Sequence, residues 1–300
     1  MPRLLPIAAI VTPGTITVSS TQELPEYAGL VPQLEYNYTQ YVSLENDANY
    51  VGPSNLLARL AISSAMQGEI LSIAAPQPNA SYSMDFLGPA LSCRPEDSKL
   101  LSNFTYQGTE TGDPISYISW VPSSTYNATM TTPPGFGVIS DTMTLDVEST
   151  DRARIFVLAL LSVPPDYTFL ACSLMNASYS VSFDFKYPSQ TINVTSIQYL
   201  NGVPATSSIS IYDDDFMAGS APASYQAIMD AFGRIMVGSS VTSHYGGVTS
   251  FTTLFPATAL GDLISQGNTI APNEFGPVLE RLFQNMTLSL LSSTQFQYAC

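Results

Sequence analysis

The chain has 300 residues, of which 45% are hydrophobic and only 11% are charged, whereas about 25% charged is usual. Nine Lys and Arg stand against 24 Asp and Glu, which gives a net charge of −15 at pH 7. The 17 Tyr and 14 Phe exclude a disordered chain, because they supply apolar surface for a core. The scarcity of bases excludes nucleic acid as a partner, since little is available to neutralise phosphates.

We expect residues 1–20 to form an extended segment of the kind that adjoins a membrane. Residues 21–300 are expected to form a single ectodomain, built either as one unit or as two closely packed β-rich lobes. Helices are predicted at 54–68, where Ser54 is an N-cap candidate, at 224–237, and from 273 or 277 to 291.

Strands are predicted from alternation of polar and apolar residues and from β-branched runs, at 78–86, 115–121, 142–147, 154–163, 168–174, 176–185 and 191–199. Gly88-Pro89 is expected to follow the first of these strands, and Asn201-Gly202 is a turn signal. Strands in runs with separate helices favour an α+β fold, with a β-rich antiparallel sheet or sandwich and about three helices. The five-residue identity of 79–83 with 176–180 indicates two similar strands rather than two duplicated domains.

The Asn-x-Ser/Thr acceptor pattern for N-glycans is more frequent than expected by chance. With 13 Asn and 65 Ser and Thr, chance predicts about three such sites. The chain has seven of them: Asn37, Asn79, Asn103, Asn127, Asn176, Asn193 and Asn285. Most lie on the polar side of an alternating pattern, whereas Asn285 lies in a helical one. Glycans there would hydrate a surface that carries little charge.

The three cysteines, Cys93, Cys172 and Cys300, have no metal-ligand spacing. In a secretory compartment we favour a disulfide between Cys93 and Cys172, with Cys300 unpaired or bonded elsewhere. Three buried free thiols are the alternative. The N-terminal residues make a poor signal peptide, and no apolar run is long enough to span a bilayer. Because glycan acceptors require entry into the secretory pathway, we expect the chain to be a piece of a longer protein.

Several motifs occur along the chain: Pro13-Gly14-Thr15, Gly52-Pro53-Ser54, Asn79-Ala-Ser-Tyr82, Phe86-x-Gly-Pro-Ala-Leu-x-Cys93, Cys172-x-Leu-x-Asn-Ala-Ser-Tyr179 and Glu280-x-Leu-Phe-Gln-Asn-Met-Thr-Leu-Ser289. Together they resemble the ectodomain of uncharacterised multi-spanning membrane proteins of filamentous ascomycete fungi, some of them labelled formylmethionine deformylase-like. The resemblance covers nearly the whole chain. It implies transmembrane helices in flanking segments, before residue 1 and after residue 300, and it implies no biochemical function.

The deformylase label is not supported by the residues. A peptide deformylase resembles a metallohydrolase with two His of a His-Glu-x-x-His helix and a Cys as ligands, but this chain has one His, His244. A Ser-His-Asp triad would lack a Gly-x-Ser-x-Gly elbow, and Asp213–Asp215 is better explained as a solvated turn than as a calcium site. We therefore assign no catalytic residue, metal or cofactor, and lean against an enzyme.

The sequence thus predicts a glycosylated extracellular or lumenal ectodomain of a fungal membrane protein, with adhesion, sensing or cell-wall contact as candidate roles. Its partner would be a cell-wall glycan or a protein. The alternative is a secreted or surface hydrolase of wall polysaccharide, for which acids near strand ends, Asp146, Glu148 and Asp151, are the candidates. A third reading, a gene fragment with no fold of its own, would be excluded by cooperative unfolding of the chain.

Overall fold

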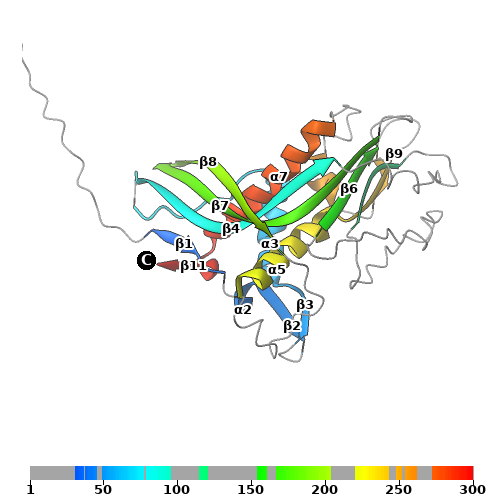
Figure 1. The fold of residues 1–300 in the computed structure, drawn as a ribbon. Helices are drawn as coiled ribbons and strands as arrows, with labels where there is room; N and C mark the ends of the chain where they lie inside the picture. Colours follow the sequence, from blue (N-terminus) through cyan, green and yellow to red (C-terminus); the bar gives the residue numbers. More distant parts are fainter. Residues whose placement is uncertain are drawn as a thin grey trace, which may run out of the picture. The chain divides into compact units, whose positions relative to one another are not determined.

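The fold comes from a computed structural model that describes residues 31–36, 38–45, 49–77, 79–95, 115–120, 154–160, 167–203, 220–242, 248–251, 254–261 and 272–299. The predictions for residues 1–20 and 142–147 lie outside these ranges. The described part combines α-helices with antiparallel sheets, so the predicted α+β class is confirmed (Figure 1).

The three predicted helices are present. Helix α3 (Asn55–Gln67) begins after Ser54, whose hydroxyl accepts a hydrogen bond from the Leu57 N–H, and it ends at Gly68 in the left-handed conformation. Helices α5 (Ser220–Met236) and α7 (Pro272–Ser289) are longer. A four-residue helix, α2 (Tyr38–Tyr41), was not predicted, because one turn is too short to carry a periodic pattern.

The main sheet has seven antiparallel strands: β4 (Ser81–Pro95), β5 (Ile115–Trp120), β6 (Arg154–Leu160), β7 (Tyr167–Lys186), β8 (Ser189–Gly202), β9 (Gly238–Thr242) and β10 (Val248–Phe251). Two small sheets pair β1 (Pro32–Leu34) with β11 (Gln297–Ala299), and β2 (Val42–Glu45) with β3 (Asn49–Pro53). Single 3₁₀ turns lie at Phe255–Ala257, Leu290–Ser292 and Thr294–Phe296.

Strand β7 is the branch point of the main sheet. One edge of β7 pairs with β4. Its other edge pairs first with β6, through residues 167–173, and then with β8, through residues 175–186. We call the three-stranded part that follows this branch the arm; it consists of residues 81–89, 176–186 and 189–201 (Figure 1).

Three details of the predicted strands were wrong. Strand β4 does not end before Gly88-Pro89 but runs to Pro95. It tolerates its prolines because β4 lies at the edge of the sheet, where a missing N–H breaks no ladder. The strands predicted at 168–174 and 176–185 are one continuous strand. Asn201 and Gly202 belong to β8, since both pair with β7 instead of forming a turn.

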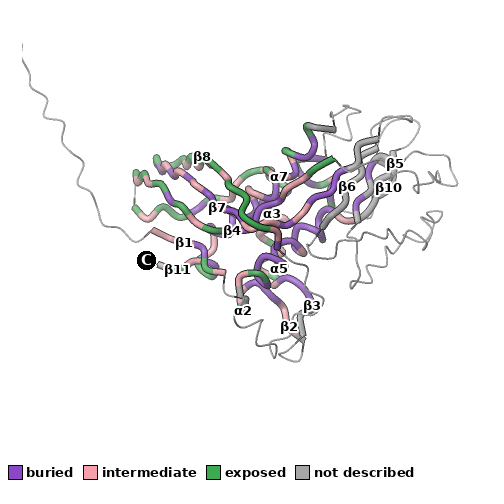
Figure 2. Tube along the Cα trace, viewed as in Figure 1, coloured by how far each residue is buried: buried purple, intermediate pink, exposed green. Residues whose placement is uncertain are grey.

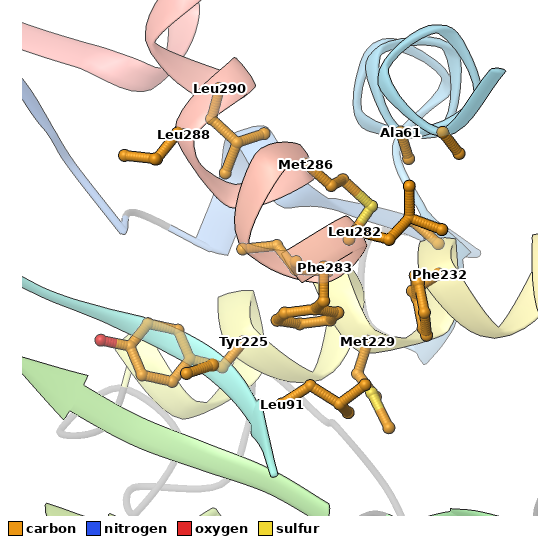
Figure 3. Close-up of a cluster of buried hydrophobic side chains, with 14 of the residues drawn as sticks. Ala61, Leu91, Tyr225, Met229, Phe232, Leu282, Phe283, Met286, Leu288 and Leu290 are labelled. Carbon is orange, nitrogen blue, oxygen red and sulfur yellow. The ribbon is translucent and has the colours of Figure 1, made fainter. Parts of the chain in front are cut away.

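The core lies where α3, α5 and α7 meet one another and β4. Phe283 of α7 is fully buried and meets Phe232 of α5 edge to face, with ring centroids 5.3 Å apart. Figure 3 shows Phe283 among Leu91 of β4 and Met229 and Tyr225 of α5, with Leu282 and Met286 toward α3. Burial of this kind supplies most of the stability of a domain.

Candidate glycan-bearing surface

One side of the arm is covered by polar side chains, with Leu87 as its apolar member. We call this side the polar face; it is made of Ser81, Ser83, Asp85, Leu87, Ser178, Ser180, Ser182, Asp184, Thr191, Asn193, Ser196 and Gln198. Its members on the two outer strands are exposed, and those on the central strand are half-buried (Figure 2). Asp85 and Asp184 are its only charged members, and Asp184 is paired with Lys186 at 2.7 Å.

Strand alternation separates the polar face from an aromatic side. Odd-numbered residues of β7 from Ala177 to Phe185 are buried, and the even-numbered ones face solvent. Across the β4–β7 ladder, Tyr82 stacks on Phe183 at 4.9 Å and Phe86 on Tyr179 at 5.1 Å. The predicted alternation around both Asn-Ala-Ser-Tyr-Ser segments is therefore confirmed, with the polar series outside.

The far end of the aromatic side is covered by the chain after α3. The Ile73 N–H donates to Gln190 Oε1 at 2.8 Å, and Gln190 Nε2 donates to the Leu71 carbonyl at 3.2 Å. The Ile73 side chain is buried. The two sides of the arm are thus unequal, since segments of this chain cover one and the described residues leave the other in solvent.

Two of the predicted glycan acceptors are exposed, one on the arm and one directly before it. Asn193 lies on the polar face, in register with Ser182 and, across β7, with Ser83. Asn79 lies in the turn before β4, with φ of 57°, a left-handed conformation that Asn tolerates better than most residues. Both side chains have the access to water that a glycan requires.

The acceptors Asn176 and Asn285 are half-buried, and their amides are already bonded. Asn176 Nδ2 donates to Asn201 Oδ1 at 3.4 Å, and its Oδ1 accepts from the Tyr225 hydroxyl at 3.4 Å. Asn285 Nδ2 donates to the Gly68 carbonyl at 2.8 Å, which ties α7 to the end of α3. The remaining acceptors, Asn37, Asn103 and Asn127, lie outside the described residues.

The predicted disulfide is present. Cys93 and Cys172 are direct partners in the β4–β7 ladder, with their Cα atoms 4.0 Å apart and their sulfurs bonded. The bond closes a separation of 79 residues. Cys300 lies outside the described residues. Disulfides persist in oxidising compartments, the same compartments in which N-glycans are added.

A cluster of buried tyrosines was not predicted from sequence. Tyr36 meets Tyr225 edge to face at 4.8 Å and stacks on Tyr41 at 5.7 Å. The Tyr179 hydroxyl donates to the Pro89 carbonyl at 2.7 Å. Burial raises the pKa of each of these tyrosines above its ordinary value, so they remain protonated at neutral pH and serve packing and hydrogen bonding. Their separation along the chain leaves no local signal.

Glu280 of α7 is a half-buried carboxylate beside the disulfide. Its Oε1 accepts a hydrogen bond from the Cys93 N–H at 2.7 Å. Burial raises the pKa of Glu280, and that hydrogen bond and the charge of Arg94 oppose the rise. The side chain therefore holds the edge of β4 against α7.

The residues considered for catalysis, Asp146, Glu148, Asp151 and His244, lie outside the described residues. The acidic run Asp213–Asp215, considered for calcium binding, lies outside them as well. Within the described part of the chain, no three His, Cys, Asp or Glu side chains gather as metal ligands.

No helix among the described residues is long and apolar enough to cross a membrane. Comparison with known proteins identifies no relative: no family model, no curated protein and no solved structure matches the chain.

Proposed function

We propose that the chain is a glycosylated domain on the extracellular or lumenal side of a fungal membrane protein. The observation that carries this proposal is the polar face of the arm, which is hydrated by hydroxyls and amides in place of charges and holds the exposed acceptor Asn193. Asn79 stands exposed beside the same strands. Glycans at these positions supply the hydration that the 11% charge content does not.

The disulfide supports the same compartment. A bond between Cys93 and Cys172 would be reduced in a cytosol and is retained after secretion. The pairing of β1 with β11 makes Pro32 and Ala299 ladder partners. This arrangement is compatible with membrane segments on both flanks, which the resemblance to multi-spanning proteins implies.

The candidate roles of such a domain are adhesion, sensing or contact with the cell wall, with a wall glycan or a protein as partner. The alternative activity, hydrolysis of wall polysaccharide, rests on acids outside the described residues, and we do not propose it.

The test is to produce the full chain in the secretory pathway of a fungal host and to measure its mass before and after endoglycosidase treatment. We expect a loss of at least the two glycans at Asn79 and Asn193, with N79Q and N193Q each removing one. N176Q and N285Q should leave the mass of the attached sugar unchanged, because those amides are half-buried and bonded.

A matched control is Thr195→Ser, which changes the same acceptor site but keeps its pattern and so keeps the glycan. If the secreted protein has the same mass before and after endoglycosidase treatment, the proposal is wrong.

A further inference from the structure

We infer that the glycan at Asn193 protects the free edge of β8 from pairing with a second copy of this chain. The inference rests on the proposed function, because it requires that Asn193 is glycosylated. It gives that glycan a second role besides hydration of the surface, namely to prevent self-association.

Strand β8 is an unusually bare edge. It is 14 residues long, and its sequence, SQTINVTSIQYLNG, has no charged residue and no proline. In the described part of the chain it pairs only with β7. Proteins normally blunt such an edge with lysines, prolines, bulges or a covering segment, because its unpaired N–H and C=O groups can bind another strand.

Bulges blunt only the second half of β8. Val194 and Ser196 face consecutive residues of β7, so Thr195 is an extra residue, and Leu200 is extra in the same way between Tyr199 and Asn201. Such insertions kink a strand and interrupt its ladder. From Ser189 to Val194 the register with β7 is unbroken.

The regular stretch Ser189–Val194 is suited to pair with itself. Thr191 and Asn193 lie on the polar side, whereas Ile192 and Val194 alternate with them and are half-buried. An antiparallel pair with Ile192 on the two-fold axis sets Thr191 of one copy opposite Asn193 of the other. This register continues the polar face and the apolar side of both sheets across the contact, and no charge in β8 opposes it.

A glycan at Asn193 blocks this contact directly. In this register each Asn193 side chain would lie beside Thr191 of the other copy on the polar face, with Cβ atoms about 5 Å apart. A branched sugar is far larger than that separation, so it covers the position that Thr191 and its strand would take. Asn193 is the acceptor inside the unbulged stretch, whereas Asn79 lies in a turn outside any strand.

The experiment compares the molar mass of secreted variants by light scattering after gel filtration. We expect N193Q to double its protein molar mass in a concentration-dependent way, and T195S to remain monomeric like the original chain. N79Q, which also lacks one exposed glycan, should remain monomeric. Endoglycosidase treatment of the folded original chain should produce the same dimer, which keeps the test independent of any effect of substitution on folding.

Variants with a lysine in place of the sugar test whether monomers require a charge at the edge of β8 or only a more soluble surface. N193K lacks the glycan but puts a lysine on the edge, so it should remain monomeric. In N193Q/S83K the same charge lies on the same face, two strands away at β4, and the dimer should persist.

The inference is overturned if N193Q and the deglycosylated protein both stay monomeric, if N79Q dimerises equally, or if the secreted chain carries no sugar at Asn193. In the first two cases the proposed function stands, because the glycans are present. If no acceptor carries sugar, the proposed function fails as well.

Discussion

The two halves of β7 have opposite surroundings. From Leu170 to Leu174, residues on both sides of the strand are buried, including Ala171 and Cys172. From Ala177 to Phe185 only alternate residues are buried (Figure 2). The strand is thus buried on both faces in its first half and on one face in its second half. Its sequence changes accordingly, from mostly apolar residues to strict polar–apolar alternation.

The comparison teaches how a chain with few charges maintains a solvent face. In the first half, contacts within the chain replace water on both sides. In the second half, the Ser side chains of β7 meet water on one side, and Asn193 of the neighbouring strand β8 offers an exposed sugar acceptor. The following predictions test whether stability resides in the buried half and hydration in the arm.

The largest effect is expected from truncating the core. Phe283→Ala should lower the free energy of unfolding by about 3–5 kcal/mol, because it leaves a cavity beside Phe232. Leu87→Ala on the polar face, where Leu87 is 55% exposed, should cost less than about 0.5 kcal/mol. Denaturant unfolding of both variants measures the contrast, and equal losses would refute it.

Removal of the disulfide should have the next largest effect. The C93S/C172S double variant should lose about 2–5 kcal/mol, since the bond restricts the unfolded chain over a separation of 79 residues. Reductant should lower the stability of the original chain and leave the double variant unchanged. The double variant keeps only Cys300, so a reductant effect on it would mean that Cys300 forms a disulfide with another molecule.

The same substitution should act differently at the two kinds of Asn. Asn285→Asp removes the donor to the Gly68 carbonyl and should cost about 1–3 kcal/mol. Asn193→Asp, on the exposed face, should cost less than about 0.5 kcal/mol. Both variants are measured on protein made without glycans, and a larger loss for Asn193→Asp would reverse our assignment of the two regions.

The smallest effect concerns pH. Burial raises the pKa of Glu280 in the folded protein, so folding favours its protonated form. This contribution is complete below the unfolded pKa of about 4.3, and it is lost as pH rises through the higher folded value. Solvent screening at this half-buried site keeps the effect modest.

Glu280→Gln keeps an oxygen acceptor for the Cys93 N–H but cannot titrate. Its free energy of unfolding should therefore fall less than that of the original chain as pH rises from about 4 toward neutrality. Glu274→Gln, which removes an exposed acid from the first turn of the same helix, is the control. An unchanged pH dependence in Glu280→Gln would contradict the assignment.

The sequence predicted well what local patterns encode. Ser54 and Gly68 mark the ends of α3, and alternation places Ser178, Ser180 and Ser182 in solvent. The cysteine pair was favoured because each Cys lies beside a strand with the same Asn-Ala-Ser-Tyr-Ser pattern. In these cases the residue types themselves determine the conformation or the chemistry.

What the sequence did not predict depends on contacts between distant residues. Strand β7 pairs first with β6 and then with β8, and no residue pattern within β7 indicates where its partner changes. Asn176 and Asn285 fit the acceptor pattern as well as Asn193 does, but Tyr225 and Gly68 engage their amides from remote positions. Tertiary contacts thus decide which acceptors remain available.

The pairing of β1 with β11 also has a mechanical consequence. Pro32 opposite Ala299 is the outermost pair of this antiparallel ladder, and beyond Leu34 the Glu35 N–H donates to the Phe296 carbonyl. A force that pulled Pro32 and Ala299 apart would break these bonds one after another from the outermost pair inward, instead of shearing them together. The ladder would therefore open before the force reached α7.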